Sequence, residues 1–281
     1  MKNIELSNGV QIPSIGFGTY KAAESGYEVI AEAIRAGYRH LDTAWLYGNE
    51  KEVGRAVKES GLPREAFFIT SKLDRDHLGY ENAKAQFRET LENLGMDYLD
   101  LYLIHWPRPF YGHTGWDDWK ELDRDSWKAL EELYKEGKIR AIGVSNFLVH
   151  HLENLMDGAR IAPMVNQLEL HPGYLQKETV DFCKAHHIAV EAWSPIGRGR
   201  LLHDPLLMKI AGDHGISTAA VSLAFDLAMG YIILPKSTHK ERMIENLHAD
   251  KIHLTDEEIK AISAMAETGW SGEHPDRPDV R

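Results

Sequence analysis

Short apolar runs alternate with amphipathic stretches along most of this chain. Near the start, two alternating runs at 4–6 and 10–12 flank Asn8-Gly9, a dipeptide that favours the tight turn of a β-hairpin. Further apolar runs predict eight strands, at residues 15–18, 39–42, 67–72, 99–105, 141–145, 164–169, 189–193 and 232–235. Between them, apolar residues three and four positions apart predict helices, at residues 27–36, 50–60, 83–94, 126–136, 177–186 and 218–229.

This alternation of strands and helices predicts an α/β fold with a parallel sheet. The run at 99–104 is nearly continuous in apolar residues, as expected for a strand that is covered on both faces. Glycines follow four of the predicted helices, where a residue with positive φ ends a helix: Gly37, Gly61, Gly95 and Gly137. Eight strand–helix units favour a (β/α)8 TIM barrel over an open doubly wound sheet, with the hairpin at its N-terminus and loops over its C-terminal face.

Composition narrows the classes of function. The formal net charge of −11 argues against general binding to nucleic acid or to an anionic membrane. The single cysteine, Cys183, excludes an internal disulfide and is typical of a reducing compartment. The first residues lack the apolar stretch of a signal peptide, and no run approaches the length of a membrane span. We expect a cytoplasmic, monomeric protein whose residues 1–281 form one domain, since no Pro/Gly/Ser-rich linker divides them.

Polar residues stand at the carboxyl ends of the predicted strands, where TIM barrels carry their active sites. Asp42, Lys72 and His105 end three successive strands, and Tyr47 follows the first of them. Other strand ends carry polar or aromatic residues: Ser145, Asn146, Gln167, Trp193, Ser194, Lys236 and Ser237. An acid, a cation, an imidazole and a phenol that gather at one face of a barrel suggest acid–base chemistry.

The four residues suit the transfer of a proton to a carbonyl oxygen. A free tyrosine titrates near pH ~10, too high for efficient catalysis at neutral pH. An adjacent ammonium lowers the pKa of a phenol, so we expect Lys72 to lower that of Tyr47. Asp42 would keep the lysine charged and fixed, and His105 would orient the carbonyl and stabilise the developing alkoxide.

Each residue taken alone has a simpler interpretation. Asp42 fits a helix cap, Tyr47 a packed aromatic, Lys72 a solvated strand end and His105 a satisfied core histidine. It is their joint position in the predicted barrel that favours catalysis.

Three motifs then stand in a characteristic order. The first is Gly-Tyr-Arg-His-Leu-Asp-Thr-Ala at 37–44, with Tyr47 and Gly-Asn-Glu at 48–50. The others are Gly-Val-Ser-Asn-Phe at 143–147 and Ile-Leu-Pro-Lys-Ser at 233–237. With these motifs the chain resembles the aldo-keto reductase family from residue 10 to about residue 246, and within it the bacterial members similar to 2,5-diketo-D-gluconate reductase.

The resemblance implies a nicotinamide cofactor and a set of site residues. Asp42, Tyr47, Lys72 and His105 would be the catalytic tetrad. The positions implied in cofactor binding are Ser145, Asn146 and Gln167 at the carboxamide, Trp193 on the ring, Gly18, Thr19, Tyr20 and Ser194 in the groove, Lys236, Ser237 and Arg242 at the 2′-phosphate, and Glu245 and Asn246 at the adenine. Outside this context, Lys236 and Arg242 would be read as a solvated surface pair. Within the family's cofactor site, two neighbouring cations suit a phosphate monoester, so we expect NADPH.

Some positions depart from the family pattern. Asp74 stands where relatives often carry tryptophan, two places after the catalytic lysine, and Trp193 replaces a frequent tyrosine. The segment 108–120 is rich in aromatic residues, which would form either a hydrophobic plug or a substrate wall: Phe110, Tyr111, Trp116 and Trp119. The tail 269–281 shows no helical pattern and would either fold over the barrel mouth or fray.

Some residue patterns in the chain are also typical of two other enzyme classes. Tyr80-x-x-x-Lys84 and Tyr134-x-x-x-Lys138 mimic the Tyr/Lys pair of short-chain dehydrogenases, but Gly16-Phe17-Gly18 lacks the third glycine of their dinucleotide turn. Fifteen histidines suggest a metal hydrolase, yet the neighbours His150-His151 and His186-His187 should point in diverging directions on helices. No His-x-His or His-Glu-x-x-His motif occurs, and we expect no metal site.

We therefore expect an enzyme that reduces a carbonyl by direct hydride transfer from NADPH, with Tyr47 as the general acid. Trp45, His105 and Trp106 would line the substrate pocket. Sugar-derived dicarbonyls such as 2,5-diketogluconate, methylglyoxal and simple aldehydes all fit as substrates. The alternative is a non-catalytic, nucleotide-binding regulatory member of the same fold, which the complete tetrad disfavours.

Overall fold

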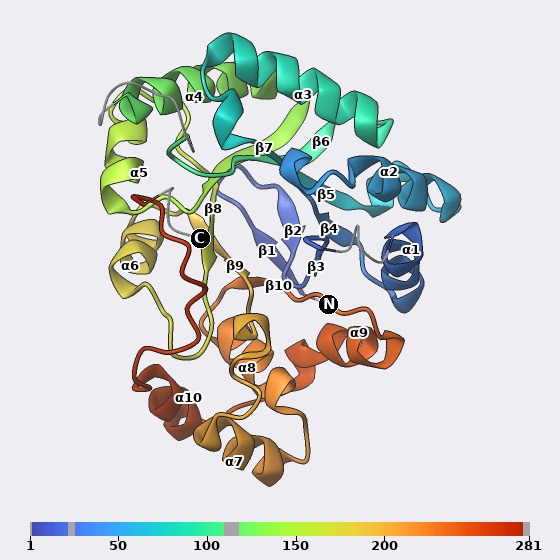
Figure 1. The fold of residues 1–281 in the computed structure, drawn as a ribbon, viewed down its shortest axis with the longest axis vertical. Coiled ribbons are helices and arrows are strands. Elements are labelled where there is room, and N and C mark those ends of the chain that lie inside the picture. Colours follow the sequence, from blue (N-terminus) through green and yellow to red (C-terminus); the bar gives the residue numbers. More distant parts are fainter. Residues whose placement is uncertain (1, 22–25, 110–117, 278–281) are drawn as a thin grey trace.

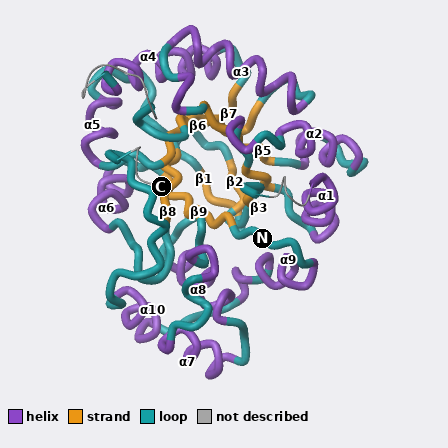
Figure 2. Tube along the Cα trace, viewed as in Figure 1, coloured by secondary structure: helices purple, strands orange, loops and turns teal. Residues whose placement is uncertain are grey.

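A ring of eight parallel strands forms the centre of the computed structural model, which describes residues 2–21, 26–109 and 118–277 (Figures 1 and 2). Neighbouring strands follow chain order from β3 to β10. The ring closes where Gly16 N donates to Ile233 O at 2.8 Å and Ile233 N donates to Ser14 O at 2.9 Å. Its strands are β3 (Phe17–Gly18), β4 (His40–Asp42), β5 (Phe68–Leu73), β6 (Leu99–Ile104), β7 (Ile139–Ser145), β8 (Val165–Glu169), β9 (Ala189–Trp193) and β10 (Ile232–Leu234). The predicted TIM barrel is confirmed.

The predicted hairpin is also present. Strands β1 (Asn3–Glu5) and β2 (Gln11–Pro13) pair antiparallel, with Ile4 opposite Ile12, and Gly9 takes a positive φ of 85° in the turn. Figure 1 shows the hairpin behind the ring of strands. Leu6 and Ile12 are buried, so the hairpin covers one end of the barrel with apolar side chains.

Helices surround the ring on its outer side (Figure 2). They are α1 (Gly26–Ala36), α2 (Glu50–Glu59), α3 (Tyr80–Leu94), α4 (Trp119–Lys135), α5 (Val149–Met156), α6 (Lys177–Ala185), α7 (Pro205–His214), α8 (Thr218–Ala228), α9 (Lys240–Leu247) and α10 (Asp256–Ser263). In the described part of the chain, no helix combines the length and apolarity that are needed to cross a membrane.

The helices correct the sequence prediction in two respects. Helix α4 begins at Trp119 rather than at residue 126, and helices α5, α7, α9 and α10 were not predicted. Cap signals for two of the missed helices were present in the sequence. Asp204 caps α7 by accepting bonds from the backbone N–H groups of Leu206 and Leu207, and Thr255 and Glu258 form a capping box at α10.

Strand register places polar side chains at the same level inside the barrel. Gln167 on β8 lies opposite Glu191 on β9, and Asp42 on β4 lies opposite Thr70 on β5. Residues opposite each other on parallel neighbours point to the same face of the sheet. The barrel interior therefore holds a polar layer near the carboxyl ends of its strands, and the candidate site is built on this layer.

Helix α2 packs so closely on α3 that Gly54 has no room for a side chain. A Cβ atom at Gly54 would lie 2.0 Å from the carbonyl oxygen of Leu94. We predict that Gly54→Ala lowers the free energy of unfolding by about 1–3 kcal/mol, the usual cost of overpacking. Gly212 on α7 has open space around it, so Gly212→Ala should be neutral or stabilising. Urea denaturation measures the free energy of unfolding of both variants. Equal changes at Gly54 and Gly212 would contradict the close contact between α2 and α3.

Candidate active site

An ion pair lies at the carboxyl ends of β4 and β5. Lys72 Nζ lies 2.7 Å from Asp42 Oδ1 and 2.8 Å from Asp42 Oδ2, and it donates to Thr43 O at 2.9 Å. The Lys72 side chain is fully buried. Burial opposes its charge, but Asp42 and Tyr47 outweigh burial and raise the pKa of Lys72 above its ordinary value. The expected pairing of Asp42 with Lys72 is therefore present, and the lysine is held as a cation.

Tyr47 lies beside this pair on the short 3-10 turn η2 (Trp45–Tyr47). Gly48 ends the turn in the left-handed region, with φ of 64°. Asn49 anchors the segment, because its amide donates to Thr19 O at 2.9 Å and its Oδ1 accepts from Thr43 Oγ1 at 2.7 Å. Lys72 Nζ lies 5.1 Å from the centre of the Tyr47 ring. The turn thus places a phenol against a buried ammonium.

The net effect on the Tyr47 hydroxyl differs from the expectation. Burial raises the pKa of Tyr47 to about 12, and the opposing effect of Lys72 is smaller. Lys72 lowers the pKa as expected, but the cost of burying a phenolate is larger than its attraction to the cation. Tyr47 therefore keeps its proton at neutral pH, which is the state that a proton donor needs.

His105 follows β6 and faces Tyr47, with the two ring centres 5.6 Å apart. Burial, followed by the charges of Lys72 and Arg75, holds the pKa of His105 well below its usual range. The ring is therefore neutral at physiological pH. His105 Nδ1 is buried and has no hydrogen-bond partner among the described residues. A neutral imidazole beside a protonated phenol matches the expected pairing of an orienting group with an acid.

The expected substrate contacts are Trp45, two residues before Tyr47, and Trp106, directly after His105. Trp45 packs against the His77 ring at 4.8 Å, and Trp106 packs on His105 at 6.5 Å between ring centres. The Arg75 guanidinium lies 4.4 Å from the centre of the Trp106 ring. The Asp74 carboxylate accepts from Asp76 N and lies 3.5 Å from His77 Nδ1, so this departure from the family pattern caps a turn.

The residues implied at the carboxamide meet at the ends of β7, β8 and β9. Asn146 takes a left-handed φ of 63°, and its amide nitrogen donates to His105 O at 3.0 Å. Trp193 Nε1 donates to Asn146 Oδ1 at 2.8 Å, and Ser145 Oγ donates to Gln167 O at 3.0 Å. These bonds connect three strand ends to His105. The structure brings the expected set together next to the tetrad.

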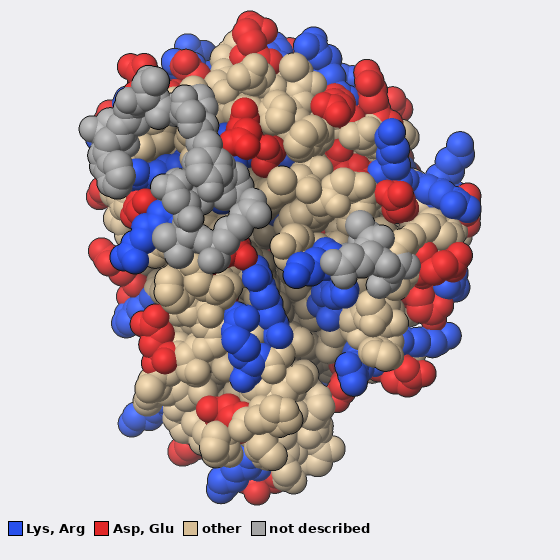
Figure 3. Space-filling view, in the orientation of Figure 1, with Lys and Arg blue, Asp and Glu red and all other residues tan. Residues whose placement is uncertain are grey.

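A groove of about 630 Å³ lies beyond β10, between the start of α8 and helix α9. All five residues that the resemblance implies around the adenosine end line this groove: Lys236, Ser237, Arg242, Glu245 and Asn246. On the face seen in Figure 3, Lys and Arg atoms border a hollow near the middle, although the protein as a whole is acidic. Two cations and a hydroxyl in one groove can hold a phosphate monoester.

The segment after β3 lies between the groove and the tetrad. Gly18 N donates to Pro235 O at 3.2 Å and Thr19 N donates to Asp42 O at 2.9 Å. Tyr20 packs on Tyr47, with ring centres 5.1 Å apart. Opposite it, Ser194 Oγ accepts from Arg198 Nε at 3.4 Å. Gly18, Thr19 and Tyr20 therefore connect the segment after β10 with Asp42 and Tyr47. Ser194 is linked to Tyr20 only through Arg198, which lies near both.

Arg198 ties the C-terminal tail to this segment. Its guanidinium lies 5.4 Å from the Trp193 ring centre and 5.8 Å from that of Tyr20, and it pairs with Glu273 at 2.8 Å. Ser271 donates to both carboxylate oxygens of Glu169 at the end of β8. The tail therefore folds back against the carboxyl end of the barrel, as far as residue 277; residues 278–281 lie outside the described residues.

The tail is anchored by His150 and His151, whose side chains do not diverge as predicted. Their Nε2 atoms each lie 3.1 Å from Asp276 Oδ1, and Arg108 lies 3.0 Å from the same oxygen. The His151 Nδ1 atom accepts from Leu148 N, so the hydrogen of the neutral ring lies on Nε2. A metal ion would need that nitrogen bare and would be repelled by Arg108. The cluster is a tail anchor.

Part of the aromatic segment belongs to the same anchor. Trp119 is buried, and its ring centre lies 4.7 Å from that of His151 and 5.9 Å from that of His150. It packs beneath the tail anchor at the start of α4. The predictions for Phe110, Tyr111 and Trp116 concern positions outside the described residues.

Sequence reasoning missed two fully buried residues beneath the tetrad, His40 and Glu191. Gln167 Nε2 donates to Glu191 Oε2 at 2.6 Å and to Asp42 Oδ2 at 2.8 Å. Glu191 was detectable as an ionisable residue in the middle of the apolar run 189–193. His40 lies in the motif at 37–44, two residues before Asp42, and carries no separate signal in the sequence.

We predict that neither partner of the Lys72–Asp42 pair is tolerated in the barrel without the other. Asp42→Ala should lower the free energy of unfolding by about 3–5 kcal/mol, because it leaves a buried ammonium without its partner. Adding Lys72→Met should recover most of that loss. The exposed pair Lys209–Asp213 on α7 is the control, where Asp213→Ala should cost no more than about 1 kcal/mol. Urea denaturation of each variant measures the costs; similar costs at both sites would refute a buried pair.

The chain is similar to known proteins over most of its length. Residues 14–267 match the Aldo/keto reductase family. Glyoxal reductase of Bacillus subtilis is 48% identical over 276 residues, which cover 97% of this chain and 96% of that protein. The 9,11-endoperoxide prostaglandin H2 reductase of Trypanosoma cruzi is 43% identical over 278 residues, covering 97% and 94%. The crystal structure of an aldo/keto reductase from Brucella melitensis matches with a TM-score of 0.86 and 40% identity, covering 93% of this chain and 98% of that one. The chain belongs to the aldo/keto reductase family.

Proposed function

We propose that this protein reduces small aldehydes and ketones with NADPH and that Tyr47 is the proton donor. The proposal rests on the placement of the protonated Tyr47 phenol and the neutral His105 imidazole beside the buried Lys72–Asp42 pair. The centres of the two rings lie 5.6 Å apart. One group has a proton to give, and the other can hold an oxygen without competing for that proton. The family membership supports an oxidoreductase.

Each side chain of the tetrad has a separate role in the reduction of the carbonyl group. The cofactor, when bound, supplies the hydride that adds to the carbonyl carbon. The His105 ring holds the carbonyl oxygen near the Tyr47 hydroxyl, and Tyr47 transfers its proton to that oxygen. Lys72 stabilises the phenolate that remains, and Asp42 keeps Lys72 charged and in place. With the hydride added to carbon and the proton to oxygen, the C–O π bond is broken, a C–H and an O–H bond form, and the C–O single bond remains.

The groove beside α8 and α9 supports NADPH rather than NADH. Lys236 and Arg242 supply two cations, and Ser237 supplies a hydroxyl, in a groove of about 630 Å³. A phosphate monoester carries up to two negative charges and three acceptor oxygens, which such a set satisfies. We also propose that the protein is a monomer and that residues 1–281 form a single catalytic domain.

The substrate class follows from the walls and the relatives. We propose that the Trp45 and Trp106 rings, which pack on His77 and His105, form apolar walls beside the tetrad. Two relatives are named for carbonyl substrates: the glyoxal reductase of Bacillus subtilis, and the aldehyde reductase of Saccharomyces cerevisiae, which is 37% identical. We propose glyoxal, methylglyoxal and 2,5-diketogluconate as the first substrates to test.

Removing the Tyr47 hydroxyl should abolish turnover but not binding. Tyr47→Phe should lower kcat for methylglyoxal about 10²–10⁴-fold, the usual contribution of general acid catalysis, and leave the Kd for NADPH nearly unchanged. Loss of NADPH absorbance measures kcat, and quenching of protein fluorescence measures Kd.

Tyr80→Phe is the matched control. Tyr80 is a partly buried tyrosine on α3, four residues before Lys84, and its hydroxyl bonds to Glu132. It lies outside the candidate site, so this change should leave kcat unaltered. Unchanged turnover in Tyr47→Phe would overturn the assignment. Tight NADPH binding by the wild-type protein without turnover on any carbonyl would favour a regulatory nucleotide-binding role.

Cofactor preference should depend on the two groove cations. Lys236→Met and Arg242→Met should each raise the KM for NADPH about tenfold or more, since each removes a charge-assisted hydrogen bond, and should leave the KM for NADH nearly unchanged. Lys209→Met on α7, outside the groove, should change neither value. Steady-state kinetics with both cofactors test this, and parallel losses for NADPH and NADH would contradict a phosphate site.

A further inference from the structure

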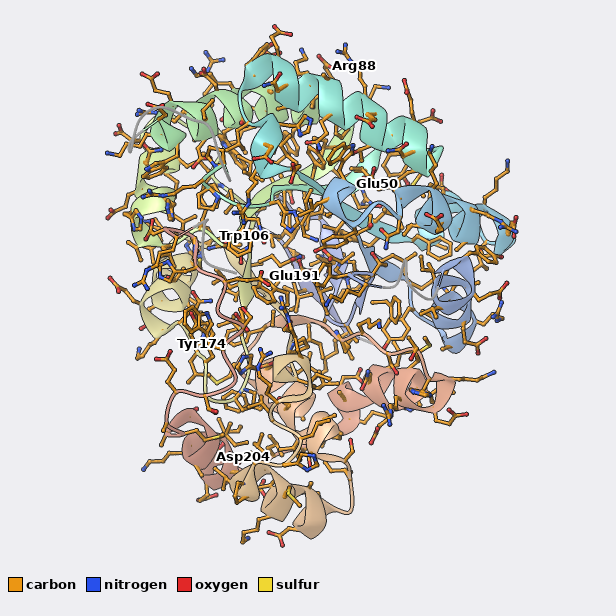
Figure 4. All side chains as sticks on the ribbon, in the orientation of Figure 1. Glu50, Arg88, Trp106, Tyr174, Glu191 and Asp204 are labelled. Carbon is orange, nitrogen blue, oxygen red and sulfur yellow. The ribbon has the colours of Figure 1, made fainter. Side chains whose placement is uncertain are left out.

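Glu191 lies inside the barrel, one layer beneath the tetrad. It is fully buried on β9, in register with Gln167 on β8 and Ile232 on β10. Figure 4 shows Glu191 near the middle of the ring of strands, remote from the outer helices. A carboxyl group in such a place is costly to ionise unless it is paired with a cation. What surrounds it therefore decides its protonation state.

The Gln167 amide bridges Glu191 and the catalytic pair. Its nitrogen donates to Glu191 Oε2 at 2.6 Å and to Asp42 Oδ2 at 2.8 Å. Asp42 is paired with the Lys72 ammonium, so its oxygens can only accept, and the amide nitrogen must face it. Both amide hydrogens are then used on carboxyl groups. Gln167 Oε1 is left without a hydrogen-bond donor among the described residues and is available to a ligand.

The His40 ring shows which form of Glu191 fits. His40 Nδ1 lies 3.4 Å from Pro13 O, which can only accept, so the ring hydrogen lies on Nδ1. Burial lowers the pKa of His40 to about 3, so the ring is neutral and its Nε2 atom is bare. That atom lies 3.1 Å from Thr70 Oγ1 and 3.6 Å from Glu191 Oε1. The Thr70 hydroxyl can donate to this nitrogen, so Glu191 Oε1 faces an acceptor and has no hydrogen-bond partner among the described residues. A buried carboxylate oxygen without a donor is unfavourable, so the uncharged carboxylic acid fits better.

The charges around Glu191 agree with this form. The ionisable groups that face it are His40 and Asp42 on β4 and Lys72 on β5; Gln167 on β8 is uncharged. With a neutral imidazole, one ammonium balances only one carboxylate, so a proton on Glu191 makes the buried cluster neutral. Burial, followed by the charge of Asp42, raises the pKa of Glu191 to about 8.

We propose that protonated Glu191 is a positioning residue, which holds the Gln167 amide so that its Oε1 faces the carboxamide of the nicotinamide. The inference rests on the proposed function, because the carboxamide is the ligand group that donates to Oε1. Ionised Glu191 would add a second negative charge beside Asp42 and compete with it for Gln167 and Lys72. The amide would then lose its fixed orientation, and cofactor affinity would fall.

The sign of the pH dependence follows from the raised pKa. Below about pH 8 Glu191 carries its proton, so the amide is held and affinity for NADPH is full. As pH rises through that value, the Kd for NADPH in the wild-type protein should increase about threefold to tenfold, the cost of one hydrogen bond. Fluorescence titration across this range measures the change.

Glu191→Gln is the decisive variant, because a glutamine mimics the protonated acid: it is uncharged at every pH and its oxygen accepts from Gln167. It should bind NADPH like the wild-type protein at neutral pH and should lose the alkaline rise in Kd. Glu191→Leu, which removes the acceptor for Gln167, should bind NADPH more weakly at every pH. The control is Asp226→Asn on α8, at a fully buried carboxyl without a hydrogen-bond partner among the described residues; it should keep the wild-type pH profile.

A second ligand separates the carboxamide from the rest of the cofactor. Adenosine 2′,5′-bisphosphate carries no nicotinamide, so its Kd should show no difference between the wild-type protein and Glu191→Gln at any pH. A Glu191→Gln variant that keeps the alkaline rise for NADPH would overturn the inference, as would equal changes for both ligands. Failure of the wild-type protein to bind NADPH at neutral pH would instead overturn the proposed function.

Discussion

The buried ion pair between Lys72 and Asp42 is the interaction on which the rest of the site depends. An ammonium with no exposure to solvent is stable only beside a compensating charge, and Asp42 is held at the correct distance because β4 and β5 are neighbours in a closed barrel. The pair then acts on both sides. Toward the mouth it faces the Tyr47 ring, and toward the interior it is bonded through Gln167 to Glu191. Removing either partner would leave the other charge uncompensated at the centre of both layers.

Burial sets the protonation state of every ionisable group around that pair, and it does so in opposite senses for acids and bases. It raises the pKa of Tyr47 and Glu191, so both keep a proton, and it lowers that of His105 and His40, so both rings are neutral. Lys72 and Asp42 are thus the charged members of a neutral cluster. Such a site can receive the charge that develops on an oxygen during reduction without an existing excess of either sign. The barrel therefore contributes a dry and preorganised environment as well as a set of side chains.

The barrel and the tetrad's location followed from the sequence because they depend on local patterns. Apolar runs located all eight strands, and the register of neighbouring strands brought Asp42, Lys72 and His105 to one edge. Features that depend on tertiary contacts were missed. The direction in which the pKa of Tyr47 shifts depends on its burial, which the sequence does not give. Glu191 was overlooked because its partner Gln167 lies on another strand. His150 and His151 converge because both are drawn to Asp276, which comes from a tail without any secondary-structure signal. The missed helices are short, and their stability comes from packing on the barrel rather than from a long periodic pattern.

The central claim is that hydride passes directly from the cofactor to a carbonyl carbon while Tyr47 supplies a proton to the oxygen. The most direct test is to carry out the reduction of methylglyoxal with NADPH that is labelled with deuterium at the reactive carbon of the nicotinamide, and to analyse the alcohol by mass spectrometry and NMR. The account predicts one deuterium per product molecule, bound to the carbon of the former carbonyl group and not exchanged with water. Product that carries no deuterium on that carbon, or consumption of NADPH without any alcohol, would contradict it.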